Sequence, residues 1–230
     1  MLTLLPAMIT SSTQLPNFTP NTWVNITWEE FIALAYDSAY ETGKAYYDRG
    51  KTRIEMTFLG INHAEDSSIL DTLVSIFCAR QGIPMRGLHR CSFRKDELQE
   101  CQPDLAFYLN SLENSPPRGN SSVDLDKCAP PTLVVELTPL SPSTELGEKR
   151  MLYESMGMQE YWVIDVNNVA VTAFAIADGG SKRIGISQVL PGLAIPLVQT
   201  TLERSRLEEK AATTRWLWSE FGQDLTNVVR

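Results

Sequence analysis

Two carboxylates and a lysine occupy positions where charge is costly in this sequence. Glu136 lies inside the apolar stretch 131–138, whose β-branched and aliphatic residues predict a strand covered on both faces. Asp104 begins a similar stretch, residues 103–109. A carboxylate in such a strand is destabilising unless a cation, a metal or hydrogen bonds compensate its burial. Together with Lys149, the two carboxylates could hold a divalent cation, and hard oxygen ligands favour Mg²⁺ or Mn²⁺ over zinc.

A second interpretation of the same residues is purely structural. Glu136 and Lys149 would form a buried ion pair, and Asp104 would be solvated at the end of its strand. Spacing alone leaves both interpretations open.

The period of two in a strand assigns the faces of both apolar stretches. Around Glu136, the side chains on the opposite face are Leu133, Val135 and Leu137. In the other stretch, one face holds Leu105, Phe107 and Leu109, and the other holds Asp104, Ala106 and Tyr108.

Lys149 is predicted to lie on a helix that follows the Glu136 strand. Ser143 or Thr144 caps this helix, which runs to about Met156 and ends at Gly157. Helical spacing forms one stripe from Leu146, Lys149, Tyr153 and Met156. The stripe should face the sheet, so Lys149 is expected to point inward.

The remaining elements follow from caps, turns and periodicity. Thr27 and Glu30 form a capping box that opens a helix to about Thr42. We further predict a hairpin over 45–59 around Arg49 and Gly50, a helix over 63–81, a loop over 110–130, strands over 161–165, 169–177 and 183–190, and a helix over 200–221. The expected division is an irregular arm (1–26), a central domain (27–198) and a C-terminal helix (199–230).

Composition restricts the class of protein. The net charge of −8 argues against a general nucleic-acid coat protein, but a nuclease needs only a local basic track. Four cysteines without a CxxC pair, and only two histidines, argue against a zinc cluster. We expect reduced thiols and a cytoplasmic protein without a membrane partner, because residues 1–10 lack the features of a signal peptide and no segment is long enough to span a membrane.

One basic island stands out in this acidic chain. Between positions 80 and 95 there are five basic residues, one histidine and no acid. The candidates for contact with the phosphates of DNA are Arg86, Arg90, Arg94 and Lys95. The alternative interpretation is a solvated strand edge or hairpin.

The ordered motifs resemble those of the PD-(D/E)xK nuclease superfamily. The resemblance is greatest to its bacterial endonuclease branch, domain of unknown function 820, and it covers residues 27–200. The motifs that carry it are Pro103-Asp104, Val134-Val135-Glu136-Leu137 with Ser141-Pro142-Ser143, Lys149 with Tyr153, and Glu160-Tyr161-Trp162-Val163-Ile164-Asp165. The resemblance implies an α/β (α+β) restriction-endonuclease-like core, with a mixed central β-sheet flanked by helices.

The same resemblance implies a metal site for cleavage of DNA. Asp104, Glu136 and the backbone carbonyl of Leu137 would bind Mg²⁺ or Mn²⁺. The common superfamily pattern has a lysine two positions after the glutamate, where this chain has Thr138, so the resemblance assigns the catalytic lysine to Lys149 of the next helix.

The resemblance also bears on four other residues. Glu55 matches an acidic residue of the N-terminal part, and it would act at the metal through water or lie exposed on its strand. His63 matches a histidine of relatives and is expected at a helix cap or in a loop rather than as a ligand. Tyr153 would contact a phosphate or pack in the core, and Trp162 is expected in the core.

Three functions are consistent with the sequence. The first is a metal-dependent endonuclease acting on DNA. The second is a nucleic-acid-binding or protein-binding module on the same fold that no longer cuts, which the acidic charge and Thr138 favour. The third is another metal-dependent phosphoesterase. The C-terminal helix has more large apolar side chains than packing of one helix face requires, namely Trp216, Trp218 and Phe221. We therefore also expect a homodimer through this helix.

Overall fold

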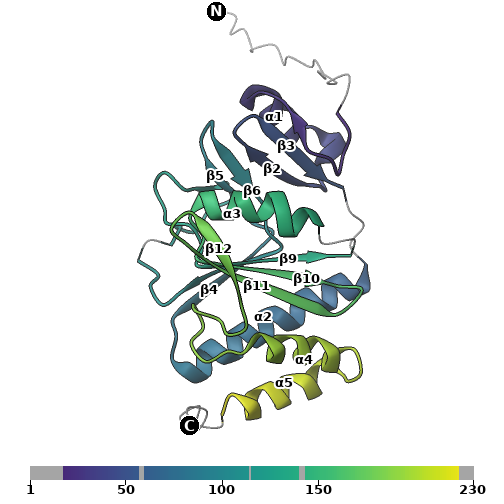
Figure 1. Ribbon diagram of the computed structural model, residues 1–230, viewed down its shortest axis with the longest axis vertical. Helices are drawn as coiled ribbons and strands as arrows, with labels where there is room; N and C mark the ends of the chain where they lie inside the picture. Colours follow the sequence, from purple (N-terminus) through teal and green to yellow (C-terminus); the bar gives the residue numbers. More distant parts are fainter. Residues whose placement is uncertain (1–17, 57–59, 114, 140–142, 223–230) are drawn as a thin grey trace, which may run out of the picture.

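The protein forms two mixed β-sheets with helices packed against them (Figure 1). The structure is a computed structural model that describes residues 18–56, 60–113, 115–139 and 143–222. Within these ranges the larger sheet has the strand order β12-β11-β10-β9-β7-β4 and the smaller sheet β1-β3-β2-β6-β5-β8. The larger sheet consists of β4 (Met85–His89), β7 (Leu105–Leu109), β9 (Leu133–Thr138), β10 (Glu160–Asp165), β11 (Ala170–Ala177) and β12 (Gly180–Ile184). The smaller sheet consists of β1 (Val24–Asn25), β2 (Lys44–Asp48), β3 (Lys51–Glu55), β5 (Phe93–Lys95), β6 (Gln99–Cys101) and β8 (Val123–Asp124).

The helices are distributed over the two sheets (Figure 1). They are α1 (Trp28–Ala35), the 3₁₀ turn η1 (Ser38–Tyr40), α2 (Ile61–Gln81), the π-helical turn η2 (Glu145–Lys149), α3 (Arg150–Met156), α4 (Ile195–Ser205) and α5 (Lys210–Glu220). Figure 1 shows α2, α4 and α5 on one side of the larger sheet and α3, with the smaller sheet, on the other. This arrangement is the mixed sheet flanked by helices that the sequence predicts.

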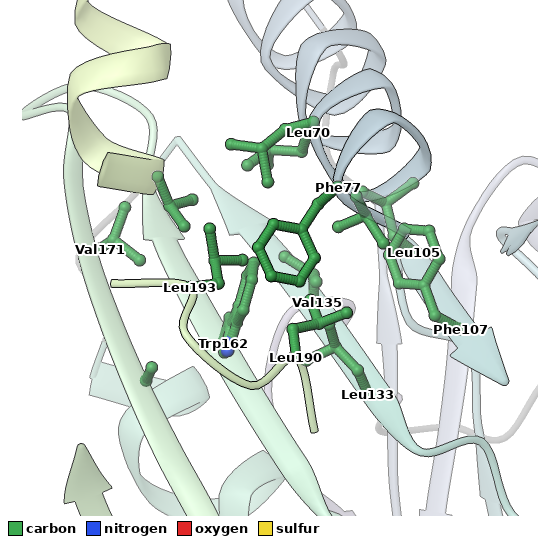
Figure 2. Close-up of a cluster of buried hydrophobic side chains, with 14 of the residues drawn as sticks. Leu70, Phe77, Leu105, Phe107, Leu133, Val135, Trp162, Val171, Leu190 and Leu193 are labelled. Carbon is green, nitrogen blue, oxygen red and sulfur yellow. The ribbon is translucent and has the colours of Figure 1, made fainter. Parts of the chain in front are cut away.

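The two faces of the larger sheet pack into two separate cores. Leu105, Phe107, Leu133 and Val135 belong to the core under α2, α4 and α5, which also contains Trp162 (Figure 2). The alternate residues of the same strands, such as Ala106 and Val134, pack with α3 and the smaller sheet. The face assignments from the period of two are therefore confirmed, as is the position of Trp162 in the core.

The buried carboxylate of Glu160 stabilises the larger sheet from within. It has no exposed surface, and its two oxygens accept hydrogen bonds from Trp162 Nε1 (2.6 Å) and from the backbone N–H groups of Gln188 (2.8 Å) and Val189 (3.3 Å). Three N–H donors compensate the burial of this carboxylate without a cation. Glu160 thereby ties β10 to the segment that follows β12.

Strands β9 and β10 are parallel neighbours, and the crossover between them contains η2 and α3. The stripe predicted to face the sheet does so, because Lys149, Tyr153 and Met156 are all buried. The helix ends at Gly157, whose left-handed φ of 86° suits a glycine. The predicted cap is wrong at Thr144, which is itself helical and makes no side-chain cap hydrogen bond.

The predicted hairpin is present as β2 and β3. Its two turn residues, Arg49 and Gly50, both have positive φ (44° and 93°), the geometry that matches the twist of a two-residue hairpin. The register follows from this turn and places Lys44 directly opposite Glu55.

The predicted elements near the N-terminus need correction. The capping box of Thr27 and Glu30 is confirmed. However, α1 ends at Ala35 rather than near Thr42, because the side chain of Asp37 accepts a hydrogen bond from Ala39 N and caps η1 instead. Residues 24–25 of the predicted irregular arm form β1, while residues 1–17 lie outside the described ranges.

The predictions are also wrong for two elements after residue 180. The strand expected over 183–190 is β12, which ends at Ile184, and the N–H groups of Gln188 and Val189 instead donate to Glu160. The single helix expected over 200–221 is two helices, α4 and α5, separated by residues 206–209. Arg206 lies in this break and donates hydrogen bonds to Asp66 Oδ2 (2.6 Å) and to the carbonyl of Val166 (2.6 Å).

Candidate active site

Asp104 and Glu136 are neighbours because β7 and β9 are antiparallel. Leu105 lies opposite Val135, so the residue before β7 lies beside Glu136. Both carboxylates are buried, and Oδ2 of Asp104 accepts a hydrogen bond from Leu137 N–H at 2.9 Å. Asp104 is thus not solvated at a strand end, which excludes that part of the structural interpretation.

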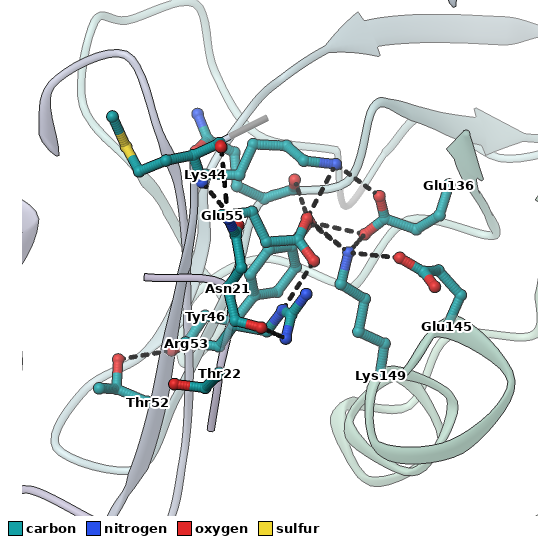
Figure 3. Close-up of polar contacts among 12 residues, drawn as sticks. Asn21, Thr22, Lys44, Tyr46, Thr52, Arg53, Glu55, Glu136, Glu145 and Lys149 are labelled. Atoms are coloured by element: carbon teal, nitrogen blue, oxygen red, sulfur yellow. Dashed lines mark hydrogen bonds and ion pairs between the residues drawn. The ribbon is translucent and has the colours of Figure 1, made fainter. Parts of the chain in front are cut away.

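Lys149 reaches the same place from the crossover. Its Nζ lies 2.8 Å from Glu55 Oε2, 3.4 Å from Glu136 Oε1 and 3.6 Å from Glu145 Oε1 (Figure 3). The π-helical turn η2 carries both Glu145 and Lys149, so this ammonium lies among three carboxylates. The ion pair with Glu136 exists, but as one contact within a larger cluster.

Glu55 joins the cluster from the smaller sheet. It ends β3, is 7% exposed, and pairs with Arg53 Nε at 2.9 Å as well as with Lys149. The expectation of an exposed strand residue is therefore wrong. The structure brings together the four residues that were predicted to be catalytic: Glu55, Asp104, Glu136 and Lys149.

The sequence analysis missed Lys44, which is at the centre of this cluster. Its Nζ lies 2.8 Å from Glu136 Oε2, 3.0 Å from Asp104 Oδ1 and 3.5 Å from Glu55 Oε2. The predicted hairpin could have identified Lys44, because a two-residue turn at Arg49 and Gly50 places Lys44 opposite Glu55.

Two tyrosine hydroxyls fix the orientation of Glu136. Oε1 of Glu136 accepts hydrogen bonds from Tyr153 (2.5 Å) and Tyr46 (2.8 Å). Lys149 Nζ lies 3.2 Å from the hydroxyl of Tyr46 and 4.3 Å from its ring centroid, close enough for a cation–π interaction. Tyr153 packs in the core and also belongs to the site, whereas nothing in the sequence pointed to Tyr46.

His63 lies in the first turn of α2, not in a cap or loop as expected. It is 6% exposed, and its Nε2 is 3.5 Å from Asp104 Oδ1 without a hydrogen-bond partner among the described residues. A buried imidazole nitrogen thus points into the carboxylate cluster.

The lysines determine the charge state of the cluster. Burial alone would raise the pKa of Asp104, but Lys44, His63 and the Leu137 N–H hold it well below its usual range. Burial opposes ionisation of Glu55 in the same way, yet Lys149 and Lys44 lower the pKa of Glu55 to about 2. At Glu136 burial prevails over Lys149 and Lys44, and its pKa is raised. Burial would lower the pKa of Lys44, but Asp104 and Glu136 raise it, so Lys44 is charged.

The donor set is chemically suited to a hard divalent cation, because Asp104, Glu136 and Glu55 converge through carboxylate oxygens. Their arrangement is that of an ammonium site, however. Mg²⁺ requires oxygens at about 2.0–2.1 Å, and among the described residues no group of three His, Cys, Asp or Glu side chains is placed to hold a metal ion. Lys44 occupies the position between the carboxylates.

Comparison with known proteins identifies the family. Residues 28–207 match the Uma2 family, described as "Putative restriction endonuclease". The chain belongs to the Uma2 family. A crystal structure described as that of a putative nuclease belonging to DUF820 from Anabaena variabilis has a TM-score of 0.49 and 18% sequence identity, over 85% of this chain and 99% of that chain. No curated protein matches the chain.

Membership of the Uma2 family agrees with the resemblance found in the sequence, and the two mixed sheets with flanking helices are its restriction-endonuclease-like fold. The strands that carry Asp104 and Glu136, and the crossover that carries Lys149, all lie within the matched residues. Among the described residues of this Uma2 protein, no helix is long and apolar enough to cross a membrane.

The four basic residues predicted to contact DNA lie on or beside strands of both sheets. Arg94 pairs with Glu100 at 2.6 Å and stacks on Trp28, and Arg90 donates to the carbonyl of Thr42 at 3.0 Å. Arg86 donates to the carbonyl of Pro116 and lines a surface cavity of about 770 Å³. Lys95 follows Arg94 on β5 and is half-buried. The four candidates are thus divided between the two sheets.

Proposed function

We propose that this Uma2 protein is an endonuclease that hydrolyses phosphodiester bonds of DNA with a divalent metal, Mg²⁺ or Mn²⁺. The observation that carries the proposal is the convergence of Asp104, Glu136, Glu55 and Lys149 from four separate elements. Burying so many charges in one cluster is costly, and a fold that needed only stability would be served as well by apolar residues. Family membership supports the same reaction class.

In this proposal Asp104, Glu136 and the backbone carbonyl of Leu137 would hold the metal, with Glu55 acting through water. When bound, such an ion lowers the pKa of a water molecule and polarises the phosphate. Lys149 lies 3.4 Å from Oε1 of Glu136, where its ammonium would stabilise negative charge on the phosphate in the transition state. Tyr46 and Tyr153 hold Glu136 in place and are positioning residues.

Cleavage of supercoiled plasmid in Mg²⁺ and in Mn²⁺ tests the proposal. We expect metal-dependent nicking that is lost in Glu136→Gln, Asp104→Asn and Lys149→Met. The matched control is Glu160→Gln, which also neutralises a fully buried carboxylate but lies outside the cluster. Retention of cleavage in Glu136→Gln would contradict the proposal. If Glu160→Gln also loses cleavage, the losses in the site variants reflect reduced stability of the fold rather than removal of a catalytic group.

One observation favours a second candidate, the binding module that does not cut. Lys44 compensates the carboxylates that a metal would need, so the cluster is also consistent with a permanent ion network. DNA binding that weakens steeply with salt, without cleavage in either metal, would select this candidate.

We also propose that the protein is a homodimer, which would place two sites on one duplex. Phe221 cannot contribute to the surface, because it is buried against Phe77 with ring centroids 5.1 Å apart. Trp218 is 53% exposed and stacks on Arg80, so it is the aromatic residue of α5 available to a partner. Light scattering at micromolar concentration should give the mass of a dimer for the wild type and of a monomer for Trp218→Glu. A monomeric wild type would contradict this proposal.

A further inference from the structure

Lys44 is bound as a cation by carboxylates from three different strands. Asp104 precedes β7, Glu136 lies in β9 and Glu55 ends β3, and one oxygen of each lies within 3.5 Å of Lys44 Nζ. The side chain of Lys44 is 8% exposed, whereas those of Asp104 and Glu136 are 1% exposed. Lys44 is buried with its partners, and the two carboxylates that it contacts most closely are buried even more deeply.

The two lysines of the cluster hold different oxygens of Glu136. Lys44 donates to Oε2 of Glu136 and also to Oδ1 of Asp104. Lys149 approaches Oε1 of Glu136 at 3.4 Å and is closer to Glu55, at 2.8 Å. Removal of Lys44 would expose Oε2 of Glu136 and Oδ1 of Asp104 together. Removal of Lys149 would leave both of these oxygens paired with Lys44.

Two buried polar atoms border the charged groups of the cluster, one beside Asp104 and one on Glu145, which neighbours Lys149. Nε2 of His63 and Oε2 of Glu145 are both buried, and neither has a hydrogen-bond partner among the described residues. His63 Nε2 points toward the oxygen of Asp104 that Lys44 contacts, at 3.5 Å. These two atoms are therefore available to a further ligand of the cluster.

An ammonium and a divalent cation cannot share this position. Lys44 holds the oxygens of Asp104 and Glu136 at 2.8–3.0 Å from its nitrogen, and Mg²⁺ would require them at about 2.0–2.1 Å. The two positive charges would also repel each other strongly at such separations in a buried site.

We propose that Lys44 is a tethered competitor of the divalent cation, which binds to Asp104 and Glu136 only when the ammonium leaves. This inference rests on the proposed metal-dependent function and adds a residue that weakens metal binding. Lys44 begins β2, and its four-carbon stem is flexible, so its ammonium can move while the strand stays in place. Lys149 stays in place beside Oε1 of Glu136.

The test measures metal binding directly, with Mn²⁺ alone as the probe. Free Mn²⁺ is quantified by electron paramagnetic resonance during titration of the wild type, Lys44→Met, Lys44→Arg and Lys51→Met. Lys51 lies exposed on the same hairpin and receives the same substitution, so it is the matched control. We expect Lys44→Met to bind Mn²⁺ about tenfold more tightly or better, since one positive charge is gone from the site. Lys44→Arg, which keeps the charge, and Lys51→Met should not bind more tightly than the wild type.

Each result either supports or overturns the inference. Tighter binding by Lys44→Met, including binding where the wild type shows none, supports it. Equal or weaker binding by Lys44→Met overturns it and leaves the metal-dependent nuclease intact if the wild type binds Mn²⁺. No binding by any variant overturns both the inference and the metal dependence. If Lys44→Met is unfolded without metal, recovery of its circular dichroism spectrum on addition of Mn²⁺ supports the inference, and failure to recover overturns it.

Discussion

The hydroxyl of Tyr153 donates a hydrogen bond to Oε1 of Glu136 across a distance of 2.5 Å. Tyr153 lies on α3 and Glu136 on β9, so this contact joins the crossover helix to the strand that it covers. Both side chains are buried, and the acceptor oxygen has Tyr46 as its second hydroxyl donor. A buried carboxylate depends on such donors for its orientation.

Tyr153→Phe should lower the free energy of unfolding by about 1.5–3 kcal/mol, the usual range for a hydrogen bond to a charged group. Urea unfolding followed by tryptophan fluorescence measures the change. The control is Tyr108→Phe, whose hydroxyl donates to a neutral carbonyl, that of Ala129, at 3.0 Å. That loss should be smaller, about 0.5–1.5 kcal/mol. Equal losses of unfolding free energy in the two variants would show that the hydrogen bond from Tyr153 to Glu136 is no stronger than one to a neutral carbonyl.

Glu160 offers a stability test outside the site. Glu160→Gln should lower the free energy of unfolding by about 1–3 kcal/mol. The amide NH₂ group of the glutamine cannot accept the hydrogen bonds that the backbone N–H groups of Gln188 and Val189 donate to the carboxylate. Glu203→Gln, on the exposed face of α4, should stay within about 0.5 kcal/mol of the wild type. Chemical denaturation measures both, and a neutral Glu160→Gln would contradict the role given to the three N–H donors.

The pKa of Glu55 predicts how stability depends on pH. The folded protein holds this pKa at about 2, below the ordinary value of 4.5, mainly because Lys149 and Lys44 oppose the effect of burial. A lowered pKa contributes stability that is fully present above pH 4.5 and is lost as the pH falls toward 2. The wild type should therefore lose unfolding free energy more steeply over this window than Glu55→Gln does.

Denaturation midpoints measured at several pH values between 4.5 and 2 provide the comparison. Glu41→Gln, at an exposed position, serves as the control and should keep the wild-type dependence. If Glu55→Gln follows the wild-type curve as well, the ion pairs with Lys149 and Lys44 do not contribute to folding stability.

Local patterns were enough to predict several elements of the fold. The alternation in 105–109 and 133–137 assigned each side chain to the correct core, and the predicted helix stop at Gly157 has a left-handed φ of 86°. These features depend on periodicity or on backbone conformation, which a single sequence displays.

Two of the errors occurred where a distant partner decides the structure. Arg206 separates α4 from α5 by bonding to Asp66, which is 140 positions away, and no local signal reveals that pair. Likewise, Gln188 and Val189 leave the extended pattern and supply their N–H groups to Glu160. Lys44 is the exception, since its partner Glu55 follows from the hairpin turn and the sequence analysis did not use it.

The basic residues allow a last prediction, concerning affinity for DNA. Each cation that contacts a phosphate contributes about 0.9 to the slope of log K against log salt. Arg94 is engaged by Glu100 at 2.6 Å and by the ring of Trp28, so Arg94→Gln should leave the slope unchanged. Arg86 lines the cavity of about 770 Å³ together with Arg118 and Lys127, and Arg86→Gln should reduce the slope by about one unit. Fluorescence anisotropy with a labelled duplex between low and physiological salt measures both slopes. A reduced slope in Arg94→Gln but not in Arg86→Gln would place the DNA on the smaller sheet instead.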